Sequence, residues 1–484
     1  MDGSRLRPGC ALKVVIGKQV KTILESIKAL FIVALLLGLV FNSPASAVQK
    51  RKPNIIFILA DDLGYGDVGP YGQKQIKTPN IDRLAAEGTR FTQAYAGGTV
   101  CAPSRSALMT GLHTGHAPVR ANAGTIPLRP EDTTVAEVLH QAGYRTGGFG
   151  KWGLGDAGSL GAPNKQGFDE FFGYLHQIHA HSYYPEFLWK NEEKYSLPKN
   201  QNGKEEQYSA DLIAEQALQF IRNHKDEPFF LYAAFALPHG KFEIPSDEPY
   251  TNMNWPQTEK NFAAMVTRLD TQVGAIMRLL KELRLDDSTI VFFTSDNGGP
   301  SGSNHKAGFF RSNGSLRGEK GDLYEGGIRV PMIVRWPGKI MPGKVSDLPW
   351  AFWDFVPTVA ALSGTKTPPN IDGISVLPTL LGAKVAGHEQ QQHQFLYWEH
   401  HLFDRKMSTL RENAMIQAVR MGDWKGVRLK PNSPLELYDL KNDHGETMNI
   451  ATKHPEIVFK LEAYMKTART EPRPHNTGSF EYAH

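Results

Sequence analysis

Apolar and polar positions along residues 48–385 form short, continuously apolar runs that alternate with longer amphipathic segments. Short runs rich in β-branched and aromatic residues predict buried strands, which we expect at Asn54–Ala60, Arg145–Phe149, Phe229–Phe235, Thr289–Thr294 and Pro331–Arg335. Apolar residues at helical spacing predict helices at Ile81–Glu87, Val135–Ala142, Ser209–Arg222 and Asn261–Leu283. This alternation favours an α/β fold in which helices flank both faces of a large, mostly parallel central sheet.

The pattern changes after about residue 385. The segment His388–Gln394 is polar and Gln-rich, as expected of a linker. It precedes short strand-like runs at Phe395–Trp398, Ala414–Arg420, Trp424–Leu429 and Leu435–Asp439, and then a helical pattern from about Pro455 to Arg469. We therefore predict a main domain over residues 48–385 and a small C-terminal subdomain over 386–484, built from an antiparallel sheet and one helix.

Residues 1–47 have the features of an export signal. The last lysine, Lys28, precedes an apolar run over Ala29–Phe41, and Ala45-Ser46-Ala47 forms a small-x-small cleavage motif. The alternative is an uncleaved anchor, although the run is shorter than the roughly 20 residues that cross a bilayer. We expect an exported protein, periplasmic or extracellular, without a stable membrane span after cleavage.

Charge and composition exclude several classes of protein. The chain has 54 Lys+Arg and 50 Asp+Glu, but without residues 1–47 both counts are 48. A net charge of zero gives no overall electrostatic attraction to nucleic acid, so we expect no nucleic-acid partner. Hydrophobic residues at 40% and charged residues at 21% are typical of a globular protein. Oligomeric state leaves no signal in the sequence.

The two cysteines lie in different parts of the chain. Cys10 lies in the leader, so the mature chain keeps only Cys101 and cannot form an intramolecular disulfide. A lone thiol in an exported protein is either buried and inert or chemically special.

Polar clusters follow two of the predicted strands. Asp61-Asp62 comes directly after the first strand, and Ser295-Asp296-Asn297-Gly-Gly follows the strand at 289–294. Each cluster alone would be a cap or a turn. Because ligands bind outside the carboxyl ends of strands in α/β sheets, the clusters can converge on one site. Together they offer oxygen ligands for Ca²⁺ or Mg²⁺, and they contain no His or Cys that would favour zinc.

A third motif runs from Cys101 to Gly111. Pro103 suits the first turn of a helix and Gly111 its end, so Cys101 is predicted at a helix N-terminus, where anions are favoured. Arg105 adds a fixed positive charge one turn further on. The alternative is a buried structural cysteine, but the neighbouring side chains are small and polar.

Cys101-x-Pro103-Ser104-Arg105 with the following Thr110-Gly111 resembles the signature of type I sulfatases. Further motifs extend the resemblance over about residues 48–385: Asp61-Asp62-Leu-Gly, Thr78-Pro79-Asn80-Ile-Asp82-Arg-Leu-Ala, Gly150-Lys151-Trp152, Pro238-His239, Asp296-Asn297-Gly, Gly318-Glu-Lys320 and Glu325-Gly-Gly-Ile-Arg329-Val-Pro331. The C-terminal strands resemble the family's second domain. The resemblance implies an alkaline-phosphatase-like α/β sandwich.

The resemblance also implies a reaction. In these enzymes a maturation enzyme, the formylglycine-generating enzyme, oxidises the motif cysteine, here Cys101, to formylglycine. One hydroxyl of the hydrated aldehyde, a geminal diol, attacks sulfur and expels the alcohol, which leaves a covalent sulfoenzyme. The second hydroxyl then collapses to the aldehyde and releases sulfate.

Site residues follow position by position from the same resemblance. The calcium ligands would be Asp61, Asp62, Asp296, Asn297 and the modified Cys101, with Mg²⁺ as an alternative ion. Arg105 would hold the formylglycine, Lys151 and Lys320 would bind sulfate oxygens, and His239 would protonate the leaving oxygen.

One position departs from the family pattern. Gly-Lys-Trp-His-Leu-Gly is common in sulfatases, whereas this chain has Gly153 in place of the histidine. Residues that could replace it, or contact substrate instead, are His113, His116, His176, His179 and His181. The stretch from Asn164 through Trp189 resembles bacterial sulfatases that act on galactose- or N-acetylgalactosamine-configured sugars, which implies substrate-binding roles for His179 and His181.

The sequence therefore predicts a sulfuric ester hydrolase that acts on a sulfated carbohydrate. One alternative is a formylglycine-dependent phosphodiester or phosphonate monoester hydrolase. The other is a non-catalytic protein that binds sulfated glycans, which the missing histidine at Gly153 would favour.

Overall fold

The computed structural model describes residues 19–30, 51–122, 126–302, 304–404 and 409–473. The chain divides into two units, residues 1–51 and 52–484. In the first unit, residues 19–30 form a helix, which includes the first two residues of the predicted apolar run. The rest of that run and the cleavage motif lie outside the described residues. Of the helices described, none is both long enough and apolar enough to cross a bilayer.

The second unit is built on a ten-stranded sheet in the order β11-β2-β10-β9-β1-β8-β4-β5-β6-β7. Its strands are β1 (Asn54–Ala60), β2 (Thr89–Phe91), β4 (Arg145–Lys151), β5 (Glu170–Tyr174), β6 (Phe187–Lys190), β7 (Glu193–Ser196), β8 (Phe229–Ala234), β9 (Thr289–Ser295), β10 (Met332–Arg335) and β11 (Lys344–Ser346). The central strands β9, β1, β8, β4 and β5 run parallel. Antiparallel pairs flank them: β10 lies between β9 and β2, and β6 lies between β5 and β7. The parallel arrangement that we predicted thus describes the centre of a mixed sheet.

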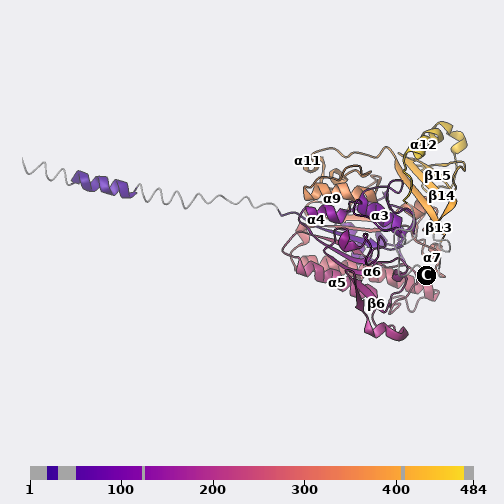
Figure 1. Cartoon of the computed structure of the whole chain (residues 1–484), viewed down its shortest axis with the longest axis horizontal. Coiled ribbons are helices and arrows are strands. Elements are labelled where there is room, and N and C mark those ends of the chain that lie inside the picture. The colour runs from indigo at the N-terminus through magenta and orange to yellow at the C-terminus, as the bar shows by residue number, and fades with distance from the viewer. Residues whose placement is uncertain (1–18, 31–50, 123–125, 303, 405–408, 474–484) are drawn as a thin grey trace, which may run out of the picture. The chain divides into compact units, whose positions relative to one another are not determined.

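Helices cover both faces of this sheet (Figure 1). In β1, Ile56 and Ile58 face a core shared with α2 (Pro79–Ala86), α5 (Ser209–Asn223) and α6 (Gln257–Glu282). Ile55 and Phe57 face the opposite core, shared with α3 (Cys101–Thr110), α4 (Val135–Gln141) and α9 (Phe355–Ser363). Successive strand residues point to opposite faces, so a continuously apolar strand such as β1 is stable only between two helical layers.

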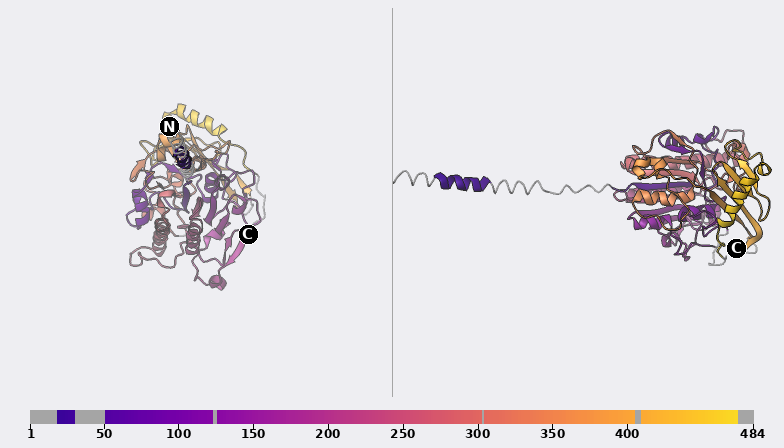
Figure 2. Two further views of the ribbon diagram at one scale, coloured as in Figure 1. Left: turned by 90° about the vertical axis from the view of Figure 1, so that its left-hand side faces the viewer. Right: turned by 90° about the horizontal axis from the view of Figure 1, so that it is seen from above.

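A second sheet, β13-β14-β15-β16, is antiparallel throughout. Its strands are β13 (Leu396–Asp404), β14 (Thr409–Met421), β15 (Trp424–Arg428) and β16 (Glu436–Asp439). The helix α12 (Pro455–Thr467) lies next to this sheet (Figure 2). Its Leu461 and Met465 share a core with Tyr397 and Val419 of the sheet. Trp398 on the other face packs against Tyr95 and Trp353. The small antiparallel sheet with one helix is confirmed, and the domain boundary at residue 385 stays a prediction.

Short elements complete the fold. They are β3 (Ala94–Tyr95), which pairs with β12 (Trp350–Ala351), and the helices α7 (Ala307–Phe310), α8 (Glu325–Ile328), α10 (Leu377–Leu381) and α11 (Ala383–Ala386). The longer predicted strands and helices all occur, with ends that differ from the predicted ends by a few residues. An α/β fold is confirmed.

Candidate active site

Four adjacent parallel strands carry the predicted site residues at their carboxyl ends. In the order of the sheet, these strands are β9, β1, β8 and β4. Asp296 and Asn297 follow β9, Asp61 and Asp62 follow β1, His239 lies beyond β8, and Lys151 is the last residue of β4. Neighbouring parallel strands end at the same edge of a sheet, so residues more than two hundred positions apart meet there.

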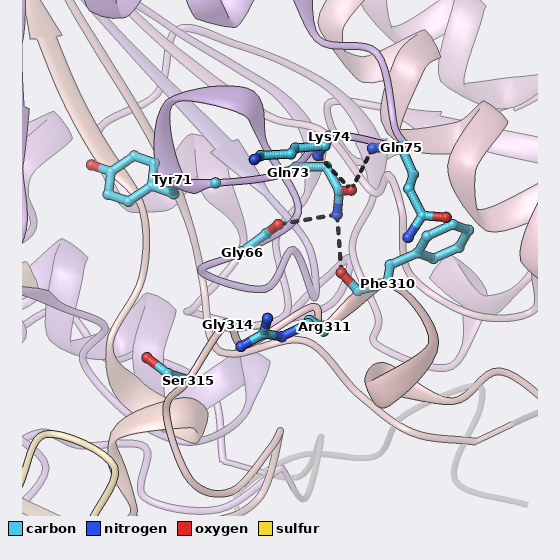
Figure 3. A pocket seen from close by; sticks show the side chains of 10 residues that line it. Gly66, Tyr71, Gln73, Lys74, Gln75, Phe310, Arg311, Gly314 and Ser315 are labelled. Atoms are coloured by element: carbon cyan, nitrogen blue, oxygen red, sulfur yellow. Dashed lines mark hydrogen bonds between the residues drawn. The ribbon is translucent and has the colours of Figure 1, made fainter.

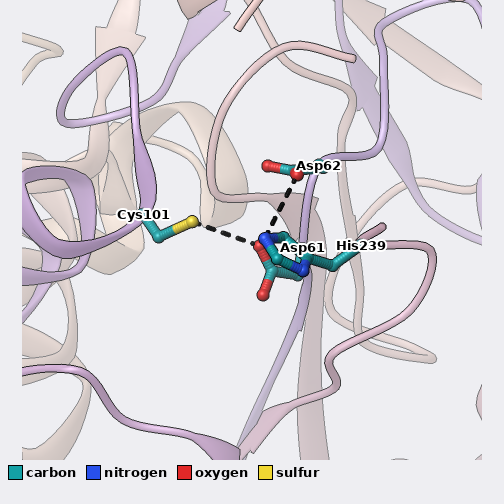
Figure 4. A group of neighbouring side chains, drawn as sticks. All are labelled: Asp61, Asp62, Cys101 and His239. Atoms are coloured by element: carbon teal, nitrogen blue, oxygen red, sulfur yellow. Dashed lines mark hydrogen bonds and ion pairs between the residues drawn. The ribbon is translucent and has the colours of Figure 1, made fainter. Parts of the chain in front are cut away.

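Cys101 is the first residue of α3 and is completely buried. Its Sγ lies 3.3 Å from Asp61 Oδ1 and 3.1 Å from Lys151 Nζ, and Figure 4 shows it pointing toward Asp61. Burial and the Asp61 carboxylate raise the pKa of the thiol well above its usual range. A reactive cysteine needs the opposite shift, because the thiolate is the nucleophile. The unmodified side chain is therefore a protonated thiol with little nucleophilic character at neutral pH.

Lys151 and Asp61 form a fully buried ion pair with 2.6 Å between Nζ and Oδ2. Burial alone would raise the pKa of Asp61, but the charge of Lys151 and of the other cations outweighs it and holds that pKa well below its usual range. Asp61 is consequently ionised, and Lys151 carries its proton.

Arg105 joins α3 to the ends of two strands. Its Nε and Nη2 donate to Asp296 Oδ2 at 3.1 and 2.8 Å, and its Nη1 donates to the carbonyl of Lys151 at 2.5 Å. Burial and the nearby Asp61 raise the pKa of Asp296 to about 6, so Asp296 is still ionised at neutral pH beside the guanidinium. Removing Arg105 would leave a buried charge unpaired.

Asp62 is surrounded by three partners. Lys320 Nζ lies 2.7 Å from its Oδ2, Asn297 Nδ2 donates to its Oδ1 at 2.8 Å, and His239 Nε2 lies 3.6 Å from its Oδ2. Burial would raise the pKa of Asp62, but Lys320 and His239 lower it. The backbone of Asp62 has a φ of 66°, a left-handed conformation that costs energy for a residue other than glycine and often marks a functional position.

The chemistry of this donor set fits a hard divalent cation. One ligand atom from each of Asp61, Asp62, Cys101 and His239 lies within 4.8 Å of the others. The Oδ1 atom of Asn297 is buried and, among the described residues, has no hydrogen-bond partner. Clustered carboxylate oxygens and an unused amide oxygen are ligands that Ca²⁺ prefers. The predicted ligand Asp296 is tied to this group, since its Oδ1 accepts a hydrogen bond from the main-chain N–H of Asp62 at 3.1 Å.

His239 is almost entirely buried. Burial and the charge of Lys151 lower the pKa of its imidazole to about 3, so the ring is neutral at neutral pH. Tyr183 holds the loop that carries His239 in place. Its hydroxyl donates to the carbonyls of Ala236 at 2.5 Å and His239 at 2.9 Å. A bound anion would raise the pKa of His239, because negative charge favours the protonated ring.

The two histidines predicted to bind substrate lie in different environments. The ring of His181 lies against that of His239, with 4.6 Å between centroids, and Lys151 and Lys320 are among the charges that act on it. The ring of His179 packs instead between Tyr174 and Phe187, at centroid distances of 5.1 and 4.7 Å. The structure thus brings His181 to the cluster, whereas the ring of His179 packs against aromatic side chains.

At Gly153, the departure from the family pattern, the side chain of Gln177 occupies the space that a Cβ would take. A Cβ at this position would lie 1.8 Å from Nε2 of Gln177, and its φ of 80° disfavours any other residue. Both amide atoms of Gln177 are buried and, within the described chain, have no hydrogen-bond partner. They border a cavity of about 10 Å³, enough for roughly one water molecule. Gln177 therefore occupies the space beside Gly153.

Of the other histidines considered as replacements, His176 lines this same cavity beside Gly153, and its Nδ1 accepts from the main-chain N–H of Ile178. His113 and His116 instead stack on each other and contact Asp372. Sequence reasoning did not single out Gln177 or the loop-holding role of Tyr183. Only the position of both in the aromatic, His-rich stretch after β5 could have suggested them.

The mixed ten-stranded sheet, the small antiparallel sheet and the buried cluster at the carboxyl ends of the strands define an α/β sandwich of the alkaline-phosphatase-like class. The family model described as Sulfatase matches residues 53–365, and the one described as N-sulphoglucosamine sulphohydrolase, C-terminal, matches residues 319–471. The chain belongs to the sulfatase family and is a sulfuric ester hydrolase.

Similar proteins cover most of the chain. Human arylsulfatase A is 34% identical over 86% of this chain and 88% of its own length. The N-acetylgalactosamine-6-O-sulfatase of Bacteroides thetaiotaomicron is 32% identical over 87% of this chain and 94% of its own length. The solved structure of Ps i-CgsB in complex with k-i-k-neocarrahexaose is 30% identical, with a TM-score of 0.75, and covers 88% of this chain and 95% of that one.

Proposed function

We propose that the protein removes sulfate from a carbohydrate, of galactose or N-acetylgalactosamine configuration, with a formylglycine derived from Cys101. The observation that carries this proposal is the environment of Cys101. It is a buried, protonated thiol at a helix N-terminus, held between Asp61 and Lys151. Such a thiol is unsuited to act as the nucleophile itself. The side chain of residue 101 nevertheless lies at a helix N-terminus, where the binding of an anionic substrate is favoured.

Once oxidised by a maturation enzyme with an external oxidant, residue 101 supplies the hydroxyl nucleophile as a hydrated aldehyde. A Ca²⁺ ion held by Asp61, Asp62, Asp296 and Asn297 would supply positive charge to the sulfate oxygens. The unused Oδ1 of Asn297 supports this assignment.

The chain's own cations would bind and orient the sulfate. Both lysines contact the cluster: Lys151 pairs with Asp61 and Lys320 pairs with Asp62. Ammonium groups fixed before the reaction stabilise negative charge that develops on sulfate oxygens without reorganisation. Arg105 would position residue 101 through its ties to Asp296 and to the carbonyl of Lys151.

His239 would protonate the leaving oxygen. Its Nδ1 is buried and has no hydrogen-bond partner in the described part of the chain. Because its pKa is lowered to about 3, the ring would need the negative charge of a bound sulfate to gain its proton. His181, which packs against His239, would contact the sugar beside the scissile ester.

A carbohydrate substrate is supported by the relatives. One is named for N-acetylgalactosamine, and the similar structure holds k-i-k-neocarrahexaose. The alternative phosphonate monoester hydrolase has a similar solved structure at 20% identity and a TM-score of 0.63, which supports a shared fold and nothing more.

Initial rates on a matched panel test the proposal. The panel contains sulfated galactose and N-acetylgalactosamine oligosaccharides, an aryl sulfate, and the corresponding phosphate diester and phosphonate monoester. We expect kcat/KM to be highest for a sulfated saccharide and to vanish in Cys101→Ser. Faster turnover of the phosphorus esters would favour the alternative hydrolase. Glycan binding without turnover in formylglycine-containing protein would favour a binding protein.

We also propose that residues 1–47 direct export and are removed. The basic segment, apolar run and small-x-small motif support this. The N-terminal sequence of protein recovered outside the cytoplasm tests it: we expect Val48 as the first residue, and retention of Met1 would contradict cleavage.

A further inference from the structure

A cavity of about 450 Å³ lies between residues 66–75 and residues 310–315. Figure 3 shows the residues that line it. Tyr71, Gln73 and Lys74 line one side, and Arg311 and Ser315 line the other. None of its ten lining residues is acidic, and none belongs to the candidate active site. The cavity is therefore a separate, positively charged pocket.

The positive charges of this pocket are uncompensated. Lys74 and Arg311 are exposed, and among the described residues neither has a carboxylate within ion-pair distance. Arg90 lies over the Tyr71 ring, 5.2 Å from its centroid, and it also lacks a carboxylate partner within the described chain. Cations that are grouped in a concave site and not neutralised attract anionic ligands.

The walls of the pocket are fixed in place. Gln73 Nε2 donates to the carbonyls of Gly66 at 3.1 Å and Phe310 at 3.2 Å, while its Oε1 accepts from the main-chain N–H of Lys74 at 2.9 Å. Arg311 has a φ of 56°, which is strained for a residue other than glycine. The hydrogen bonds of Gln73 and the backbone of Arg311 thus hold the shape of the pocket, while the exposed side chains of Lys74 and Arg311 are free to reach a ligand.

One wall continues into a catalytic loop, and the other is hydrogen-bonded to both catalytic loops. Gly66 follows Asp62 by four residues, so their Cα atoms lie within about 14 Å of each other. On the other wall, the carbonyl of Ser312 accepts from Gly66 N–H at 2.6 Å, and Asn313 Oδ1 accepts from Gly299 N–H at 2.9 Å. The pocket is thus built on the two loops that hold Asp62 and Asn297.

We propose that this pocket binds a second anionic group, a sulfate ester or a uronic carboxylate, on the saccharide whose scissile sulfate lies at Cys101. The inference rests on the proposed function and adds that the preferred substrate is polyanionic. Lys74 and Arg311 would contact the second anion, while the catalytic cluster would bind the first. Selectivity between substrates would then depend on the charges of Lys74 and Arg311, which lie outside the site of the reacting ester.

The test uses the full-length, formylglycine-containing enzyme and a double variant, Lys74→Gln with Arg311→Gln. The matched control is Lys339→Gln with Lys366→Gln, which removes two exposed charges that do not line the pocket. Substrates are a saccharide with one sulfate, a disulfated oligosaccharide, a monosulfated oligosaccharide that contains a uronic acid, and an aryl sulfate.

We expect the pocket variant to lower kcat/KM for one or both dianionic oligosaccharides by about tenfold, mainly through KM, and to leave the monoanionic substrates unchanged. Whichever dianionic substrate loses activity identifies the second anion. The difference from wild type should shrink at high salt, because screening weakens such contacts. Unchanged kcat/KM on both dianionic substrates, or an equal loss on all substrates, would overturn the proposal.

Direct binding separates this inference from the proposed function. Titration of Cys101→Ser, with and without the pocket substitutions, with the same oligosaccharides measures the pocket without turnover. Weaker binding only in the pocket variant would support the pocket even if no substrate were cleaved. Equal binding in both backgrounds would overturn it whatever the activity.

Discussion

The ammonium group of Lys151 lies 2.6 Å from Asp61 Oδ2 and 3.1 Å from Cys101 Sγ, with all three side chains buried. One positive charge therefore touches both a proposed metal ligand and the residue proposed to become the nucleophile. Lys151→Met should lower kcat by about 10²-fold or more, because a fixed charge near the sulfate oxygens is lost.

The Lys151 variant also removes the partner of a buried carboxylate, so its thermal stability must be measured beside kcat. The exposed Lys165, which pairs with Glu192 at 3.5 Å, offers the control Lys165→Met. That control should keep full activity. If Lys151→Met kept wild-type kcat while folded, Lys151 would have no role in the reaction.

Gly153 and Gly158 provide a matched pair for the steric argument. Both have a φ of 80°, but a Cβ would lie 1.8 Å from Gln177 at Gly153 and meet nothing within 4 Å at Gly158. Gly153→Ala should cost about 1–3 kcal/mol more unfolding free energy than Gly158→Ala, since only the former displaces a buried side chain. Chemical denaturation checks this difference.

The same clash predicts a partial rescue. In the double variant Gly153→Ala with Gln177→Ala, the stability should approach that of Gly158→Ala, because only the cost of the backbone conformation remains. Equal losses in Gly153→Ala and Gly158→Ala would show that Gln177 does not fill this space.

Calcium should stabilise the protein. A ligand that binds only the folded state at one hundred times its Kd adds about 2.7 kcal/mol, so Ca²⁺ should raise Tm by several degrees. Asn297→Ala removes an amide oxygen that has no other partner among the described residues and should reduce this shift. Asn252→Ala, an exposed control, should not. A Tm that is insensitive to both Ca²⁺ and Mg²⁺ would argue against the metal site.

Ionised Glu399 should stabilise the C-terminal sheet, and this stabilisation should be lost at acidic pH. Burial would raise its pKa, but hydrogen bonds from His401 and Arg469 and the charge of Arg120 lower it from 4.5 to about 2. A depressed carboxyl pKa stabilises the fold above pH 4.5, and this contribution is lost as the pH falls from 4.5 to 2. At neutral pH it is worth about 3 kcal/mol at most.

Glu399→Gln should therefore unfold more easily than wild type at pH 7, and the difference should shrink between pH 4.5 and 2. Glu471→Gln is the control, because Glu471 is exposed and its ion pair with Arg469 is long, at 3.9 Å. A difference between Glu399→Gln and wild type that does not depend on pH would contradict the assigned pKa.

The layered fold was predictable because its main elements have strong local patterns. The continuous apolar run of β1 is stable only when both faces of the strand are buried, and the apolar stripe along α6 is stable only when it faces a core. Their sequence patterns therefore predict their structure. The antiparallel pairing of β10 with β9 was not predictable, since a four-residue apolar run contains no information about the direction of its neighbour.

The convergence of Asp61 and Asp296 could be inferred because each follows a predicted strand, whereas Lys151 was assigned to the site only through the resemblance to sulfatases. Their partners could not, because an ion pair between residues 90 apart depends on three-dimensional packing. Gln177 shows this limit most clearly. Its amide is placed beside Gly153 by the tertiary structure. From the sequence alone, Gly153 could be recognised only as a position where the family histidine is absent.

The measurement that tests the account most directly is the mass of the peptide that contains Cys101, from protein purified from its native host. Formylglycine would lower that mass by about 18 Da relative to cysteine, because an aldehyde oxygen replaces the sulfur and two hydrogens. The account predicts this loss, together with sulfatase activity in the same preparation. An unmodified thiol in native protein that cleaves sulfate esters would contradict the proposed nucleophile.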